Sequence, residues 1–399
     1  MLKSFFGKLL DFLLSENNSS HKVEVANVRP KLTRTKVIEL IQQNGTPEGL
    51  DLSGYDLTGI NLSKLDLHGI VFGSTQILEF AYDENVLTKG AILDGAWLER
   101  CNLQKVNFGR TSLKGVHFYH SDLSESTLWA ANAEGSDFRK ANLSNVDCYT
   151  TVLNNCRFMD SKLDYANLYR ASLLGATLSA DSIKNRLLQE NLKEYKEHFT
   201  RWYVNPHVRE RYQERSINGR YKEAKEIYLA LKNAFLNSGR YEDASWAYVK
   251  ERQMERRTYF PITARNYYGS ELPENSSFTS PRWWLFYFKY TFKWLFAWAV
   301  ELVLGYGERP LRVAVWSILA IIIFAIIFFQ IDGIANTSGN MLRWFDYFQF
   351  SLATFSTIGF ADLIPINDTA KLLSSIESLF GISALAMLMF SLGNRVNRS

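Results

Sequence analysis

The chain has 399 residues, of which 47% are hydrophobic and 14% aromatic, and its formal net charge is +4 at pH 7. That length has room for three modules, and so small a charge gives no support for a nucleic-acid partner. The six histidines show no metal-ligand spacing, and neither a nucleophile motif nor a phosphate-binding glycine loop is present. We therefore expect neither an enzyme nor a bound cofactor.

The first predicted element is an N-terminal amphipathic or helical segment at residues 1–45. At its start, Lys3, Lys8 and Asp11 interrupt a series of apolar side chains. A cleavable signal peptide needs a continuous apolar stretch, so we expect none here.

Residues 46–180 contain a repeat with a period of five. Between residues 91 and 178 a large apolar residue recurs at every fifth position, and a small residue usually stands two positions before it. An earlier block at 52–72 keeps the same period, and residues 73–90 interrupt the repeat and shift its phase. A period of five fits neither the 3.6 residues of a helical turn nor the alternation of a strand, so it predicts a solenoid.

This motif resembles the pentapeptide-repeat proteins, whose chain winds as a right-handed parallel β-helix. The resemblance implies that four pentads make one coil and that the large residue of each pentad stacks in the interior. Cys101, Cys148 and Cys156 occupy the small or large positions of the repeat, so we interpret them as packing residues and not as metal ligands or disulfide partners. Some members of that family mimic DNA through an acidic surface, but acidic and basic residues are interspersed here. A scaffold or contact surface is therefore the favoured role.

Residues 181–265 are predicted to form a cytoplasmic helical hairpin. One pattern of small, basic and aromatic residues occurs twice, twenty residues apart: Gly219, Arg220, Tyr221, Ala224 and Tyr228, then Gly239, Arg240, Tyr241, Ala244 and Tyr248. Alanines that face tyrosines at helical spacing let two helices pack closely, which resembles a tetratricopeptide unit. We expect the hairpin to pack against the last solenoid coil or against the hairpin of another subunit.

The end of this helical stretch is basic. Four arginines precede the next apolar segment: Arg252, Arg256, Arg257 and Arg265. They would suit an anionic lipid or a phosphate-bearing partner, although a solvated cationic face is the simpler explanation.

Residues 281–307 are predicted to form an interfacial amphipathic helix. The stretch is dense with aromatic residues and carries Lys289, Lys293 and Glu301. Its lysines would meet lipid headgroups while the aromatic rings sink into the membrane boundary. The alternative, a further membrane span, would put the N-terminal modules outside the cell without an evident export signal, and it stays open.

Two apolar runs long enough to cross a bilayer follow. The first, residues 313–331, has nineteen residues without a charge, which is about 28 Å of helix. The second is predicted at residues 371–392, and its apolar run contains a single ionisable group, Glu377. Arginines stand before the first run and after the second, so the positive-inside rule places both termini in the cytoplasm. We expect a two-span protein of the plasma membrane.

The segment between the two runs supplies a candidate pore. Residues 344–356 are apolar and aromatic but too short to cross, which predicts a re-entrant pore helix. Residues 357–362 follow with the sequence Thr-Ile-Gly-Phe-Ala-Asp. This hexapeptide resembles the signature of two-transmembrane potassium channels: threonine, valine or isoleucine, glycine, tyrosine or phenylalanine, glycine, aspartate. Thr354, Pro365 and Gly381 also stand at the offsets that the family uses.

The resemblance implies a selectivity filter at residues 357–362. A permeant K⁺, the only metal ion expected, would exchange its water for oxygens of four residues: Thr357, Ile358, Gly359 and Phe360. Three neighbours would support this filter: Thr354, Ala361 and Asp362.

Two residues of the second run are further candidates. Gly381 matches the gating hinge of the family, although a glycine that lets helices pack closely is an equal alternative. Glu377 is either an ion contact or a group that hydrogen-bonds behind the pore helix.

Ala361 departs from the family signature. The family has a glycine with positive φ there, and a Cβ in that conformation costs about 1–2 kcal/mol. We therefore expect a homotetrameric potassium-type cation channel, with two alternatives: a nonselective cation channel, and a membrane-anchored scaffold with a silent pore.

The predicted fold class is a multi-domain membrane protein that joins a β-helix, a helical hairpin and an all-α two-span pore. The cytoplasmic module would gate or assemble the pore. Its expected partners are copies of the chain, the lipid bilayer and an unknown cytoplasmic ligand or protein at the solenoid or hairpin.

Overall fold

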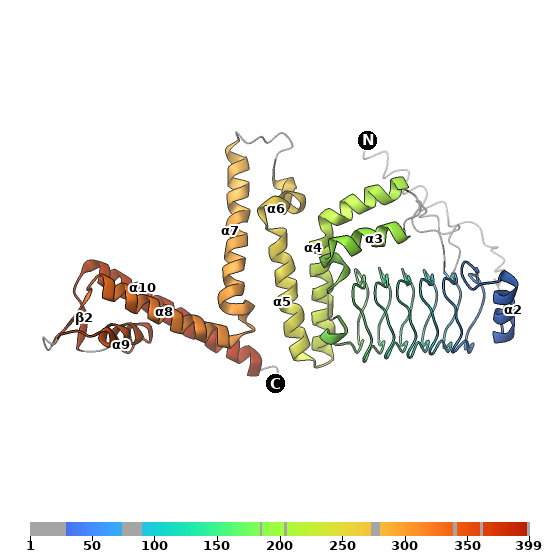
Figure 1. The fold of residues 1–399 in the computed structure, drawn as a ribbon, viewed down its shortest axis with the longest axis horizontal. Helices are drawn as coiled ribbons and strands as arrows, with labels where there is room; N and C mark the ends of the chain where they lie inside the picture. Colours follow the sequence, from blue (N-terminus) through green and yellow to red (C-terminus); the bar gives the residue numbers. More distant parts are fainter. Residues whose placement is uncertain are drawn as a thin grey trace, which may run out of the picture.

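The computed structural model describes residues 29–73, 90–183, 186–202, 206–272, 280–337, 341–359 and 362–396. The amphipathic segment predicted at the start of the chain and most of the interruption of the repeat lie outside the described residues. The molecule is elongated, with the solenoid at one end and the helices α8 (Pro310–Gln330) and α10 (Asp368–Val396) at the other (Figure 1).

The repeat folds as a ladder of short parallel bridges. Asn102 pairs with Asp122, and Asp122 pairs with Asn142, so each coil takes twenty residues, or four pentads. The large residue of each pentad points into the coil, where the rings of Phe118 and Phe138 stack with 4.8 Å between their centroids. The predicted solenoid is confirmed, and the three cysteines within it are free and buried.

Each pentad turns through a left-handed residue two positions after its large residue. Arg100 (φ 54°) follows Leu98 in this way, and Lys105 (φ 56°) follows Leu103. Outside glycine this conformation costs about 1–2 kcal/mol. The turn residue offsets part of that cost through the ladder, since the Arg100 N–H donates to the Tyr119 carbonyl of the next coil at 2.9 Å. The five-residue period is therefore the distance between successive corners of the coil.

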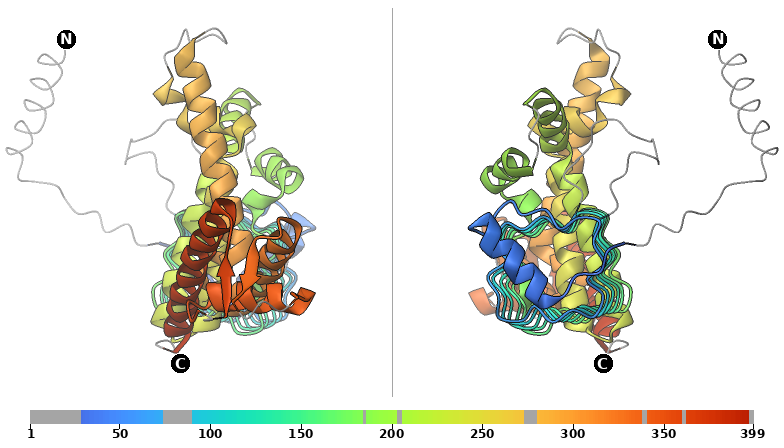
Figure 2. Two further views of the ribbon diagram at one scale, coloured as in Figure 1. Left: turned by 90° about the vertical axis from the view of Figure 1, so that its left-hand side faces the viewer. Right: turned by 90° about the vertical axis from the view of Figure 1, so that its right-hand side faces the viewer.

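The first coil is covered by α2 (Arg34–Asn44). Thr33 caps this helix by accepting from the Lys36 N–H at 3.3 Å, and Val37 is fully buried. The Arg34 guanidinium donates to the Asn61 carbonyl at 2.8 Å. Figure 2 shows α2 lying across the open end of the coils, where it covers the first rung of the ladder.

The last coil is covered by helices that follow it in the chain. The turns η2 (Ala180–Ile183) and η3 (Leu188–Glu190) lead to three helices, which are α3 (Leu192–Trp202), α4 (Pro206–Asn237) and α5 (Tyr241–Thr258). Leu178 of the last coil, Tyr228 of α4 and Ala244 of α5 belong to one continuous buried core. The pair α4–α5 therefore packs on the solenoid of its own chain.

The two copies of the glycine pattern have different surroundings. Gly239 (φ 71°) makes the turn between α4 and α5, whereas Gly219 lies inside α4. The pattern therefore does not mark two equivalent helix starts, and the tetratricopeptide likeness stays a prediction.

A connecting unit joins the α4–α5 pair to the C-terminal helices. It consists of α6 (Pro261–Tyr268), η4 (Gly269–Glu271) and α7 (Pro281–Leu304), which ends in the turn η5 (Gly305–Gly307). In Figure 1, α7 stands between α5 and the two C-terminal helices and runs across their direction.

The C-terminal module contains α8, β1 (Ile334–Asn336), α9 (Trp344–Phe355), β2 (Leu363–Pro365) and α10. The two strands pair antiparallel, with Ala335 opposite Ile364. Both α8 and α10 are long and apolar enough to cross a membrane, with mean hydropathies of 2.7 and 1.7.

Both helices begin before the apolar runs from which we predicted them. Pro310 occupies the first turn of α8, where its missing N–H costs nothing. Asp368 lies in the first turn of α10, where a negative charge is favourable. Apolarity alone marks the part that can sit in hydrocarbon, and polar first turns extend the helices beyond it.

The stack of phenylalanines in the solenoid can be tested by truncating one ring. Phe138 is fully buried between Phe118 and Phe158, the latter 5.1 Å away between centroids. We expect Phe138→Ala to cost about 3–5 kcal/mol and to speed amide hydrogen exchange in the coils on both sides, measured by mass spectrometry on the full-length protein. Met159→Ala, at a side chain 65% exposed, should leave exchange unchanged. Equal exchange in the two variants would contradict a stacked core.

Candidate functional site

The short helix α9 is held between α8 and α10. Phe350 contacts Phe328 of α8 edge to face, with 5.0 Å between ring centroids. The Tyr347 hydroxyl donates to Asp332 Oδ1 at 2.6 Å. These contacts fix the position of α9 against the membrane-type helix α8.

The predicted filter starts as a turn at the C-terminal end of α9. The N–H groups of Thr357, Ile358 and Gly359 donate back into the last turn of that helix, at 3.1 to 3.4 Å. All three residues are exposed. Three of the four predicted ligands therefore lie side by side at an open surface of the single chain. Phe360 and Ala361 lie outside the described residues.

Two residues of this turn have a left-handed backbone. Gly359 (φ 71°) occupies the first glycine position of the signature, where positive φ was expected. Thr357 has a φ of 58°, which the sequence did not predict. Because threonine is β-branched, this conformation costs about 1–2 kcal/mol. Within the described residues, the strain of the turn is at Thr357.

The predicted supporting residues Thr354 and Asp362 stand at the two ends of the filter segment. The Thr354 carbonyl accepts from the Thr357 N–H at 3.1 Å and from the Ser378 hydroxyl of α10 at 3.2 Å. The Asp362 carbonyl accepts from the Thr337 N–H at 2.9 Å. One end of the segment is thereby attached to α10, and the other is attached to the residue that follows β1.

Glu377 of α10 is fully buried against α9. The Ser351 hydroxyl of α9 lies within hydrogen-bond distance of Glu377 Oε1 and 2.8 Å from the Ile321 carbonyl oxygen of α8. A serine hydroxyl has one proton, and a carbonyl oxygen can only accept. Both contacts are satisfied when Ser351 donates to Ile321 and Glu377, carrying a proton, donates to Ser351. This chain of bonds ties α10, α9 and α8 together.

Gly381 lies where α10 passes closest to the end of α9. A Cβ at this position would be 1.8 Å from the carbonyl oxygen of Phe355. The helix α10 continues unbroken through Gly381. The structure thus gives this glycine a close-packing role, and the hinge stays a prediction.

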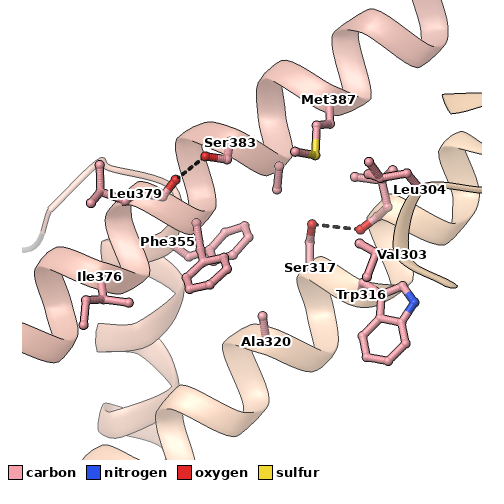
Figure 3. A pocket seen from close by; sticks show the side chains of 13 residues that line it. Val303, Leu304, Trp316, Ser317, Ala320, Phe355, Ile376, Leu379, Ser383 and Met387 are labelled. Carbon is pink, nitrogen blue, oxygen red and sulfur yellow. Dashed lines mark hydrogen bonds between the residues drawn. The ribbon is translucent and has the colours of Figure 1, made fainter. Parts of the chain in front are cut away.

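An apolar cavity of about 440 Å³ lies between α7, α8, α10 and the end of α9. Its wall includes Val303, Trp316 and Phe355 (Figure 3). The hydroxyls of Ser317 and Ser383 also line it, but each donates to a carbonyl of its own helix, at 2.9 and 2.7 Å. The protons of both hydroxyls are therefore used within their own helices.

The helix α7 exposes one apolar face. Four of its aromatic side chains are 61–73% exposed: Trp284, Phe288, Phe292 and Phe296. On the other side, Tyr290 is buried against α6. The exposed rings recur every four residues, so they form one continuous stripe along the helix.

The lysines of α7 lie on its protein-facing side. Lys289 forms an ion pair with Glu271 at 2.8 Å. Lys293 lies over the rings of Tyr259 and Tyr290, 5.5 and 5.2 Å from their centroids. The two lysines thus contact acidic and aromatic groups of the protein while they stay exposed, and their contact with lipid headgroups stays a prediction.

The turn η5 touches both the α4–α5 pair and α10, a connection that the sequence did not indicate. The Ser245 hydroxyl of α5 donates to Glu308 Oε2 at 2.6 Å. The Ser391 hydroxyl of α10 donates to the Gly307 carbonyl at 2.7 Å. These partners are 63 and 84 residues apart in the chain, so no local pattern could have found them. We call Ser245, Gly307, Glu308 and Ser391 the polar relay.

Family comparisons match the two ends of the molecule. The family described as "Ion channel" matches residues 313–398, which extend from α8 through α10. The family of pentapeptide repeats matches in eight copies within residues 89–118, 121–158 and 141–179. No curated protein sequence matches this chain.

Solved structures of pentapeptide-repeat proteins resemble the solenoid. A protein from the Arabidopsis thaliana thylakoid lumen is 18% identical, over 34% of this chain and 68% of that one, with a TM-score of 0.20. The plasmid-mediated fluoroquinolone resistance protein QnrB1 is 20% identical, over 33% and 68%, with a TM-score of 0.22. HetL of Nostoc sp. strain PCC 7120, involved in heterocyst differentiation regulation, is 17% identical, over 37% and 83%, with a TM-score of 0.20.

TM-scores of this size do not carry an assignment of fold, which rests on the family match and on the twenty-residue ladder. The C-terminal assignment rests on the channel match and on the two membrane-type helices that enclose α9. The chain therefore carries pentapeptide repeats in its N-terminal half and a two-span ion channel domain at its C-terminal end.

Proposed function

We propose that the protein is a homotetrameric cation channel of the potassium type. The observation that carries the proposal is the position of Thr357, Ile358 and Gly359, on the exposed end of a short helix seated between two membrane-type helices. Backbone carbonyls in such a turn can replace the water of a dehydrated K⁺ when several chains bring them to one axis. Phe360 would supply the next carbonyl.

The geometry of one copy supports assembly of several copies, and we propose four. A single chain offers one row of carbonyls, whereas K⁺ needs a ring of oxygens around it. The side chains of α10 are largely uncovered, with Leu379 66%, Phe380 58% and Leu385 58% exposed. Copies of the channel domain and lipid would cover these surfaces.

The proposed location is the plasma membrane, with α8 and α10 spanning it and both termini in the cytoplasm. The apolar stripe of α7 would then lie in the membrane boundary. Its direction supports this placement, because α7 runs across α8 and α10 (Figure 1). Its protein-facing side carries the α4–α5 pair and, behind it, the solenoid.

The contacts between modules supply a route for gating. Arg256 of α5 forms an ion pair with Glu301 of α7 at 3.0 Å, and the polar relay continues from α5 through η5 to α10. A displacement of the α4–α5 pair would thus reach α10 at Ser391, near its cytoplasmic end. The solenoid would assemble the subunits or bind the partner that causes this displacement.

A nonselective channel is the second candidate. Ala361 stands where the family has a glycine, and Thr357 is strained in the single chain. A filter that relaxes this strain by widening would admit hydrated cations.

Ion selectivity decides between these candidates. Purified protein in planar bilayers, between opposed K⁺ and Na⁺ gradients, should give a current that reverses near the potassium equilibrium potential. Ala361→Gly should keep or sharpen this selectivity, because it removes the Cβ from a position where the family has positive φ. Reversal near zero voltage would favour the nonselective channel. No current from either protein would favour a scaffold with a silent pore.

The close packing at Gly381 predicts the effect of one methyl group. Gly381→Ala should abolish K⁺ flux and reduce the tetramer fraction, because the new Cβ cannot occupy the space of the Phe355 carbonyl. Gly393→Ala is a matched control in the same helix, where a Cβ meets nothing within 4 Å. Flux assays and native mass spectrometry would measure both effects. Normal flux in Gly381→Ala would show that α10 does not pack on α9 in this way.

The hydrogen bond between Glu377 and Ser351 predicts which substitutions of Glu377 are tolerated. Glu377→Gln should retain K⁺ flux, because the amide N–H can donate to Ser351 as the protonated carboxyl does. Glu377→Ala should lose most of it, since it leaves Ser351 without that donor and opens a cavity behind α9. A loss in Glu377→Gln equal to that in Glu377→Ala would point to a charged carboxylate in contact with the ion.

A further inference from the structure

Where α4, α5 and α6 meet, two arginines share one tyrosine ring. The guanidinium carbon of Arg220 lies 4.6 Å from the centroid of Tyr221, and that of Arg257 lies 5.4 Å from the same centroid. Arg220 is on α4 and Arg257 is on α5, and both are half-buried. Two positive charges are therefore held against one ring in a half-buried cluster.

Neither arginine has a carboxylate partner among the described residues. Among the side chains of α4 and α5 that the structure describes, the other half-buried cations each lie within 4 Å of a carboxylate: Lys225, Lys232, Lys250, Arg252 and Arg256. In addition, Arg220 Nη1 is buried and without a hydrogen-bond partner in the part of the chain that the structure describes. A buried guanidinium N–H left without an acceptor is costly, so the described part of this cluster lacks a group that accepts from Arg220 Nη1.

The tyrosine hydroxyls of this cluster are donors as well. The Tyr221 hydroxyl accepts from Arg220 Nη2 at 2.8 Å, and the Tyr267 hydroxyl of α6 accepts from the Tyr221 backbone N–H at 3.3 Å. Each phenol therefore has its proton left to donate. Burial raises the pKa of Tyr267 to about 12, so its proton is present at neutral pH.

The acid that lies nearest along α4 does not neutralise this charge. Glu223 accepts a hydrogen bond from the Tyr195 hydroxyl at 2.6 Å. Burial raises the pKa of its carboxyl. Two guanidinium groups and two phenols thus gather at one ring, and among the described side chains no carboxylate forms an ion pair with either arginine. This is the donor set of an anion site.

We propose that this cluster of Arg220, Tyr221, Arg257 and Tyr267 binds the phosphate group of a ligand. A guanidinium fork matches two oxygens of a phosphate, and two forks with two phenol donors satisfy a tetrahedral anion better than a flat carboxylate. A soluble phosphate compound and a phospholipid headgroup share this chemistry, and the experiment below separates them.

The site lies on the connection between the α4–α5 pair and the membrane module. Tyr267 belongs to α6, and η4, which follows directly, contacts α7 through Glu271, Lys289 and Tyr290. A phosphate that holds α6 on α4 and α5 would stiffen the attachment of α7. This use as a signal to the pore rests on the proposed channel function, whereas the binding itself does not.

Isothermal titration of the full-length protein in detergent with inorganic pyrophosphate tests the soluble source. Arg220→Gln and Arg257→Gln should each weaken binding roughly ten-fold or more. Arg240→Gln is a matched control, because this exposed arginine pairs with Asp243 at the far end of α5, and it should change binding less than about two-fold. Arg257→Lys, which keeps the charge and loses the fork, should bind with intermediate strength.

Native mass spectrometry with added phosphatidylglycerol or phosphatidylcholine tests the lipid source. Retention of phosphatidylglycerol that Arg220→Gln and Arg257→Gln reduce, and Arg240→Gln does not, would support the site with a headgroup as its ligand. The proposal is overturned if Arg220→Gln and Arg257→Gln bind both probes as the wild type does. It is also overturned if Arg240→Gln weakens binding as much as those two variants do. Both assays are independent of ion flux, so a silent pore would leave their outcome unchanged.

Discussion

The approach of α10 to the end of α9 at Gly381 determines where the filter turn leaves the protein. The missing side chain lets the Phe355 carbonyl lie against the backbone of α10. One helical turn away on α10, the Ser378 hydroxyl holds the Thr354 carbonyl and Glu377 meets Ser351. These contacts lie along one line of α10, so that helix sets the height and the direction of α9. The channel domain therefore depends on an interface that includes no residue of the filter.

In the rest of the chain, each module has an exposed edge that the neighbouring module covers. A β-helix ends in unpaired backbone groups, which are a hazard for aggregation if they stay open. Here α2 covers one end and the α4–α5 pair covers the other, with Tyr228 buried in the shared core. That pair in turn offers α7 a polar and aromatic surface. The helix α7 is thereby oriented, with its lysines beside protein groups and its aromatic stripe outward.

Much of this architecture could be predicted from the sequence, because its signals are local. The five-residue period reports the corners of the coil, and uninterrupted apolarity reports α8 and α10. The hexapeptide predicts a filter after α9, and Gly359 has the positive φ that its place in the signature requires. The conformation of Thr357 could not be predicted, since it results from how the chain leaves α9 and not from its own preference.

What the sequence could not provide are contacts between residues far apart in the chain. The sequence around Lys289 and Lys293 is typical of a helix that binds headgroups. Only the fold places Glu271 and two tyrosines beside these lysines. The polar relay joins serines and a glutamate that are ordinary surface residues in any local window. The sequence leaves Gly381 equally a hinge or a packing residue, and the position of the Phe355 carbonyl gives it a packing role.

The interruption of the repeat has a consequence for how such a chain can change. Asp66 pairs with Asn102, 36 residues on, whereas neighbouring coils further along pair at an interval of twenty. The ladder thus resumes in register although the chain has additional residues between Gly73 and Gly90. A corner of this solenoid is therefore a natural entry point for foreign sequence. Domains could be grafted there, by evolution or by an engineer, without disturbing the stacked core or the path from the solenoid to the membrane.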